Sequence, residues 1–120
     1  WEGSGNVICL DILRTLVKEP AAVDALNLEL EAARGSDARY AAALDDHRAA
    51  WPSLPEEAAA RLFVERTATL LTASVLIRSA PDAVADGYVT TRVAQGRGLV
   101  PGAVAILDSA ALLERIAPLY

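Results

Sequence analysis

The sequence predicts an all-α protein, an antiparallel helical bundle of about five to six helices joined by short loops. Three observations support this fold class. Hydrophobic residues make up 53% of the 120 residues, whereas aromatic residues make up only 5%. Alanine and leucine supply much of the apolar fraction, and both favour helix over sheet. Apolar residues also recur at helical spacing, between prolines and glycines that are typical of helix ends.

The first helix is expected at residues 7–18. Its polar residues Asp11, Arg14 and Lys18 form one narrow stripe, and the rest of its surface is apolar. Such a helix is buried on most sides only if it has a large neighbour. We therefore expect it to pack against a segment that precedes it, and we expect Glu19-Pro20 to end it.

Two helices are expected next. The first of them, at 21–33, has four apolar residues on one face: Val23, Leu26, Leu30 and Ala33. Gly35 is expected to end this helix, and Ser36 to cap the following one. That following helix also has one face with large side chains, formed by Tyr40, Leu44, His47 and Trp51. Pro52 closes it.

Residues 53–56 match a capping box, in which Ser53 accepts from a backbone amide and Glu56 reaches back to the start of the helix. The helix that follows is expected to run to about Ala80. Its buried side is predicted to contain Leu62, Phe63, Leu70, Ala73 and Ile77. Pro81 is expected in the first turn of a further helix that ends near Gln95-Gly96, and a last helix is expected at 104–118.

The composition argues against several functions. The formal net charge of −5 disfavours binding to nucleic acid or to an anionic membrane. A single cysteine, Cys9, permits no intrachain disulfide, and a single histidine, His47, argues against a His-rich metal site, so no metal is predicted. No apolar run is long enough for a bilayer, and the first residues do not resemble a signal peptide. We expect a cytoplasmic protein.

The chain opens with Trp1-Glu2-Gly3-Ser4-Gly5-Asn6. By composition alone, this segment is typical of a solvated turn before a helix. Together with Leu10-Asp11-Ile12-Leu13-Arg14 behind it, however, it resembles the acyl-CoA dehydrogenase family. The resemblance is to the C-terminal part of that family, nearest its adaptive-response (alkylation-response, AidB-type) flavoprotein branch. The absence of any methionine also suggests that a longer N-terminal part has been removed.

The resemblance implies a role for each residue of the segment. Glu2 would be the catalytic base that removes the α proton of an acyl-CoA, because that step needs a carboxylate near the α carbon. Gly3 would line the acyl site, and Ser4 and Asn6 would contact FAD, which carries the redox chemistry. Residues 1–19 would then form the catalytic-Glu loop and the last helix of the acyl-CoA dehydrogenase C-terminal domain.

The remaining residues, 20–120, would form an appended helical domain that serves packing or subunit assembly. The partners implied are the missing N-terminal domains of the same chain, acyl-CoA, and further copies of the protein in a homotetramer. FAD would be held by the full-length parent, whereas the isolated fragment is expected to bind none and to be inactive. A non-catalytic interaction module is the alternative, binding either protein or DNA.

Two other residues have competing interpretations. Arg14 could contact a CoA phosphate or nucleic acid, but a salt bridge to a carboxylate is favoured. His47 is expected to be a hydrogen-bonded core residue and not a base or metal ligand. The DNA-binding alternative is weakened because, from residue 22 on, nine arginines are scattered among thirteen acidic residues.

Overall fold

A computed structural model describes residues 2–94 of the chain, with the side chains from Gly5 onward. This part is all-α, as the sequence predicts, and residues 2–94 contain no strand. The five α-helices are α1 (Glu2–Lys18), α2 (Pro20–Glu31), α3 (Ala38–Ala50), α4 (Ala60–Ser79) and α5 (Asp82–Tyr88). Three short turns complete it: the 3₁₀ turns η1 (Arg34–Ser36) and η2 (Glu57–Ala59), and the π-helical turn η3 (Val89–Ala94).

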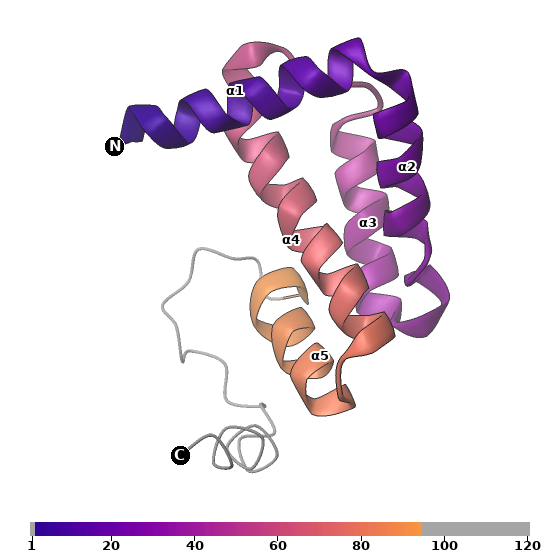
Figure 1. Cartoon of the computed structure of the whole chain (residues 1–120). Helices are drawn as coiled ribbons and strands as arrows, with labels where there is room; N and C mark the ends of the chain where they lie inside the picture. The colour runs from indigo at the N-terminus through magenta and orange to yellow at the C-terminus, as the bar shows by residue number, and fades with distance from the viewer. Residues whose placement is uncertain (1, 95–120) are drawn as a thin grey trace.

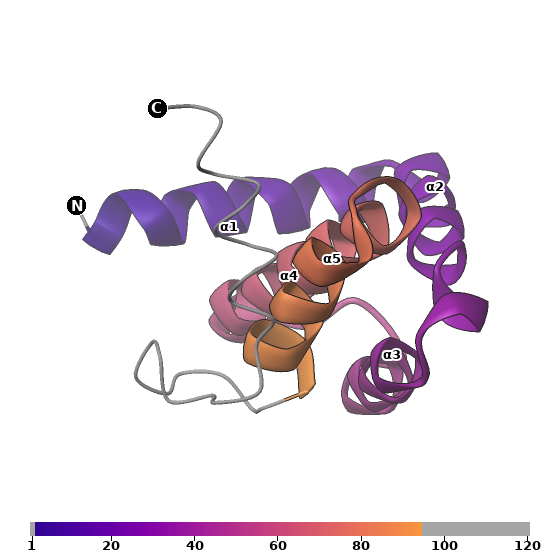
Figure 2. The same ribbon diagram turned by 90° about the horizontal axis from the view of Figure 1, so that it is seen from below.

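Helices α2, α3 and α4 run up and down beside one another, so that neighbours along the chain are antiparallel (Figure 1). Helix α1 lies across one end of this group, where it packs on α4 and α2. Helix α5 and the turn η3 pack near the other end of α4. The N-terminal part of α1 projects beyond the other helices in both views (Figures 1 and 2). The beginning of the predicted catalytic segment therefore lies away from the core.

The core lies where α2, α3, α4 and η3 meet. Its buried apolar residues are Leu30, Ala33, Tyr40, Leu44, Leu70, Ala73 and Val89. The apolar face predicted for the second helix is confirmed, because Leu30 and Ala33 are in this set and Leu26 packs against it. The face predicted for the third helix is confirmed by the burial of Tyr40, Leu44 and His47. The face predicted for the fourth helix is wrong at Leu62, which is 50% exposed. Phe63, Leu70 and Ala73 of the same predicted face are buried as expected.

Two hydrogen bonds join α2 to its neighbours in the core. The Tyr40 hydroxyl donates to the Leu30 carbonyl at 2.5 Å, and the Ser74 hydroxyl donates to the Glu29 carbonyl at 2.7 Å. Both acceptors lie in the last turn of α2, where carbonyl groups have no partner within the helix. The two side chains therefore satisfy backbone groups that would otherwise be buried without a hydrogen bond.

The start of α3 differs from the sequence prediction. Asp37, not Ser36, is the cap: its carboxylate accepts from the backbone N–H groups of Arg39 and Tyr40. Ser36 belongs to the preceding 3₁₀ turn, whereas Asp37 has the extended backbone that a capping residue needs. Gly35 lies in the same turn, four residues beyond the end of α2.

The capping box predicted at residues 53–56 is wrong. The helix α4 begins at Ala60, and its N-cap, Ala59, makes no side-chain cap hydrogen bond. Pro52 and Pro55 explain the delay, because a proline biases the residue before it toward extended backbone. Residues 51–56 instead form an irregular connection that ends in η2.

The end of the described chain agrees with the prediction in part. The helix α4 ends at Ser79, next to the predicted end at about Ala80. Pro81 is predicted in the first turn of the next helix, but it is the residue that directly precedes α5. The sequence predicts one helix up to Gln95-Gly96. In the structure α5 ends at Tyr88, and the π-helical turn η3 follows it from Val89. The predicted end at Gln95-Gly96 and the predicted helix at 104–118 lie outside the described residues. Among the helices described, none has the length and apolar character that crossing a membrane requires.

Candidate functional site

The predicted catalytic segment forms the first turns of α1. The sequence predicted a loop up to residue 6, but the helix begins at Glu2. Glycine costs a helix interior about 1 kcal/mol relative to alanine, and that cost matters least at an end. At Gly5 an added Cβ would meet no atom within 4 Å, so the backbone surface here is open. The side chains of residues 1–4, which include Glu2, Gly3 and Ser4, are outside the described set.

Asn6 is the one predicted cofactor contact whose side chain is described. Its Oδ1 accepts a hydrogen bond from Arg61 Nη1 at 3.2 Å, which links the start of α1 to the first turn of α4. Arg61 also pairs with Glu65 at 3.0 Å. The side chain of Asn6 is exposed, and its amide NH₂ is a hydrogen-bond donor that no described residue engages.

Arg14 forms a salt bridge with Glu57, which confirms the favoured interpretation. Its Nε lies 3.1 Å from Glu57 Oε2, and its Nη2 lies 3.2 Å from Oε1, so the contact is bidentate. Both side chains are 57% exposed. Pairing with Arg14 lowers the pKa of the Glu57 carboxyl below its usual range. The pair links α1 to the turn before α4, and a phosphate would have to compete with Glu57 for Arg14.

Much of the apolar surface of α1 is uncovered in the described structure. Leu13 is the buried contact with the bundle, at 1% exposure. Ile8 and Ile12, which are four residues apart and share a face, are 57% and 41% exposed, and Val7 and Val17 are more than half exposed. The sequence predicted that this helix is buried on most sides. The bundle covers one side only.

The arginines that a DNA-binding surface would need are largely paired with carboxylates. Ion pairs are formed by Arg34, Arg39, Arg48, Arg61 and Arg78. In one cluster Glu31 accepts hydrogen bonds from both Arg34 and Arg48, and they lower the pKa of Glu31 to about 2. Such pairing leaves less positive charge for phosphate groups, as expected from the mixed charges of the sequence.

His47 is a buried core residue, as predicted. Its Nε2 lies 3.1 Å from the Thr67 hydroxyl. Its ring stacks on Phe63 at 5.5 Å between centroids, and Trp51 meets it edge-on at 5.1 Å. Burial lowers the pKa of the imidazole below its usual 6.5, and the nearby guanidinium of Arg66 adds to this shift. A neutral imidazole is therefore favoured at neutral pH.

This pKa shift predicts a dependence of stability on pH. Because the folded state binds a proton at His47 less readily than the unfolded chain, its stabilisation is present above pH 6.5 and is lost as pH falls below that value. Urea unfolding followed by circular dichroism should show a falling free energy of unfolding between pH 7 and about 5. The carboxylates with lowered pKa values change the free energy of unfolding only at lower pH. His47→Gln should flatten the profile, and an unchanged slope would contradict the assignment.

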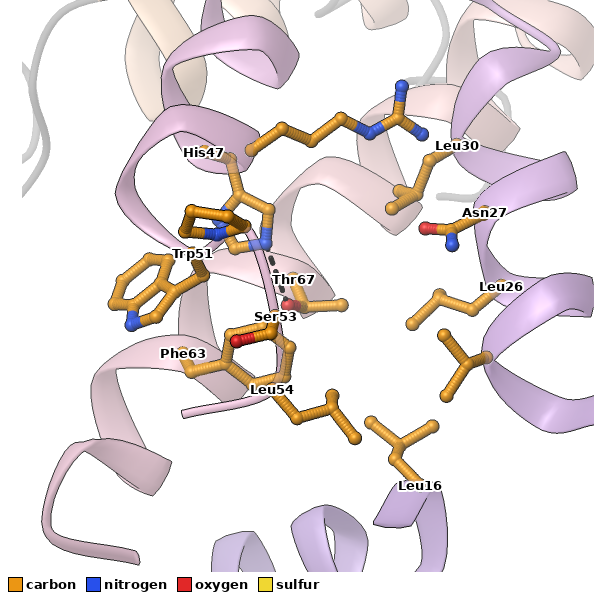
Figure 3. Close-up of a pocket in the computed structure, with 13 residues that line it drawn as sticks. Leu16, Leu26, Asn27, Leu30, His47, Trp51, Ser53, Leu54, Phe63 and Thr67 are labelled. Carbon is orange, nitrogen blue, oxygen red and sulfur yellow. Dashed lines mark hydrogen bonds between the residues drawn. The ribbon is translucent and has the colours of Figure 1, made fainter. Parts of the chain in front are cut away.

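A pocket that the sequence did not predict lies beside this aromatic cluster (Figure 3). It is bounded by α2 on one side and by α3 and the connection at 51–54 on the other. Its volume is about 250 Å³. Its lining is formed by Leu16, Val23, Leu26, Asn27, Leu30, His47, Arg48, Trp51, Pro52, Ser53, Leu54, Phe63 and Thr67. The sequence signal was the apolar face at 21–33, which was interpreted as core.

No cluster of potential metal ligands occurs among those residues of 2–94 whose side chains the structure describes.

Comparison with known proteins gave one informative similarity. Over 40 residues, 33% of its length, the chain is 48% identical to the "Putative acyl-CoA dehydrogenase AidB" of Escherichia coli (strain K12). The chain spans about 7% of the length of that relative. No protein-family model and no solved structure matches. The similarity supports an acyl-CoA dehydrogenase-like origin at the level of the family.

Proposed function

We propose that the chain is the C-terminal part of an FAD-dependent acyl-CoA dehydrogenase-like oxidoreductase. The observation that supports this best is the 48% identity over 40 residues to a putative acyl-CoA dehydrogenase. The opening Trp-Glu-Gly-Ser-Gly-Asn motif and the Leu-Asp-Ile-Leu-Arg segment behind it support the same family. In this proposal the chain supplies the catalytic base and a helical domain for packing or assembly.

In this proposal the residues of the opening segment have separate roles. Glu2 takes the α proton of the acyl thioester, because an ionised carboxylate near the α carbon is a suitable general base. Gly3 lines the acyl site, and Ser4 and Asn6 hold FAD through short hydrogen bonds. FAD, when bound, would accept the hydride that leaves the β carbon.

The described residues fit a flavin contact at this end of the chain. At the N-terminus of α1 the first backbone N–H groups have no partner within the helix, and such groups favour anionic ligands. The open surface at Gly5 and the exposed side chain of Asn6 leave room for a close approach. The pocket of about 250 Å³ lies elsewhere and is too small for a dinucleotide. The chain therefore supplies one wall of the proposed site.

The remaining walls would come from domains that precede this chain in the full protein. The uncovered apolar residues of α1, Ile8 and Ile12 among them, offer those domains a surface to bury. Further copies of the protein, in the homotetramer that the resemblance implies, could cover part of the same helix. DNA binding is the weaker alternative, because most of the described arginines are paired with carboxylates.

Flavin content tests this proposal. We expect the 120-residue chain, purified alone, to show no flavin absorbance and no dehydrogenase activity, because a single wall cannot retain the cofactor. The longer protein that includes the preceding domains should contain about one FAD per chain. Absorbance spectra of both proteins, prepared with added FAD and then desalted, provide the comparison. Stoichiometric flavin in the chain alone, or none in the longer protein, would contradict the proposal.

A further inference from the structure

The pocket between α2 and α3 has a largely apolar interior and polar residues at its rim. In Figure 3 the side chains of Leu16, Leu26 and Leu30 face Trp51 and Phe63 across the open space. Thr67 of α4 also lines this space. Two exposed polar residues, Asn27 and Ser53, lie among the lining residues and mark the rim. Within the described residues neither side chain makes a hydrogen bond, so both can bind a ligand.

The size of the pocket limits what can occupy it. A cavity of roughly 150 Å³ lined by leucine and phenylalanine is enough for benzene. The pocket here, at about 250 Å³, therefore has room for one substituted ring or a short alkyl chain. It has no room for a nucleotide or a long acyl chain. The facing leucine and aromatic side chains would contact such a molecule on two sides, as in many small-molecule sites.

The charges around the pocket favour an uncharged ligand. Arg48 is the one charged side chain among the described lining residues, and Glu31 already pairs with it. An anionic ligand would have to compete with Glu31, and a cationic ligand would find no carboxylate in the lining. Burial and the guanidinium groups of Arg66 and Arg48 also lower the pKa of His47, which favours the neutral imidazole. A desolvated charge would therefore lack compensation.

We propose that this pocket binds an uncharged, largely apolar small molecule, with a hydroxyl or amide group placed between Asn27 and Ser53 at the rim. The apolar part of the ligand lies between the leucines of α2 and the pair Trp51 and Phe63. The site is independent of the flavin chemistry proposed for the start of α1, and either could exist without the other.

Three probes of equal ring size but different charge test the proposal. Benzyl alcohol, benzoate and benzylamine are titrated into the full chain, and the amide shifts of Leu26, Phe63 and Thr67 are followed by NMR. Benzyl alcohol should bind saturably, with a dissociation constant of about 1 mM or lower. The two charged probes should bind at least about tenfold more weakly. Absence of saturable binding by benzyl alcohol, or equal binding by a charged probe, would overturn the proposal.

Two substitutions on one helix locate the binding. Leu26→Trp fills the pocket and should weaken the binding of benzyl alcohol at least about tenfold. Leu28→Trp adds the same ring at a position that is 74% exposed, and it should leave binding unchanged. Circular dichroism verifies the fold of each variant, and Val23→Phe serves as the filling variant if Leu26→Trp unfolds. Binding that survives filling of the pocket, or that is lost equally in Leu28→Trp, would show that the probe binds elsewhere.

Discussion

If the chain belongs to the longer FAD-dependent protein proposed above, Glu2→Gln in that protein should leave FAD bound while abolishing the bleaching of the flavin by acyl-CoA. Glutamine has nearly the shape of glutamate but cannot accept the α proton. Loss of a general base typically slows the chemical step by about 10²–10⁴-fold. The measurement is anaerobic stopped-flow absorbance of the flavin after mixing with acyl-CoA, together with the flavin content of the purified variant.

Glu57→Gln is the matched control for this experiment. It makes the same chemical change at an exposed glutamate whose described contact is the salt bridge with Arg14. An exposed pair contributes little to stability, so this variant should bleach at nearly the rate of the parent. Normal bleaching by Glu2→Gln would remove Glu2 from the role of base. Loss of FAD from Glu2→Gln alone would instead indicate that the carboxylate helps to hold the cofactor.

The local signals of the sequence predict the helices well. Pro20, Pro52 and Pro81 each lie within two residues of a helix boundary in the structure. The face that contains Tyr40 and Leu44 is buried as its spacing indicates. These features depend on backbone restriction and on helical periodicity, which are properties of short segments.

Features that depend on neighbouring segments were missed. Both Ser36 and Asp37 can cap a helix, but Ser36 belongs to the 3₁₀ turn, so Asp37 is the cap. The π-helical turn is a second example. Within it the Thr90 hydroxyl accepts from Arg39 of α3 at 2.8 Å, a contact across 51 residues of sequence. Leu62 was assigned to the wrong face because α4 carries apolar residues at many positions.

The candidate site also has features that the sequence predicts and features that it does not. The salt bridge of Arg14 and the hydrogen-bonded burial of His47 followed from residue type and helical position. The partners, Glu57 and Thr67, could not be named, because each lies at least 20 residues away in sequence. The pocket was missed for a related reason. Its lining combines Leu16 of α1, Leu26 of α2 and Leu54 of the connection before α4. The space left between such distant segments is not visible in the spacing of residues along the chain.

Tyr40 is expected to be the most sensitive position of the described core. Its side chain is fully buried, and its hydroxyl donates to the Leu30 carbonyl near the end of α2. Tyr40→Ala removes a buried aromatic ring, a change that typically costs about 3–5 kcal/mol. Natural domains have about 5–15 kcal/mol of stability in total, so this variant should be largely destabilised or unfolded at room temperature.

Tyr40→Phe separates the hydrogen bond from the packing. The ring remains, but the Leu30 carbonyl loses its partner in a buried place, which typically costs about 1–3 kcal/mol. Tyr88→Phe is the control, because Tyr88 packs beside the same core and its hydroxyl makes no hydrogen bond in the described structure. That change should stay within about 0.5 kcal/mol. Urea unfolding of the three variants measures the differences. Equal losses for Tyr40→Phe and Tyr88→Phe would mean that the bond to Leu30 does not stabilise the end of α2.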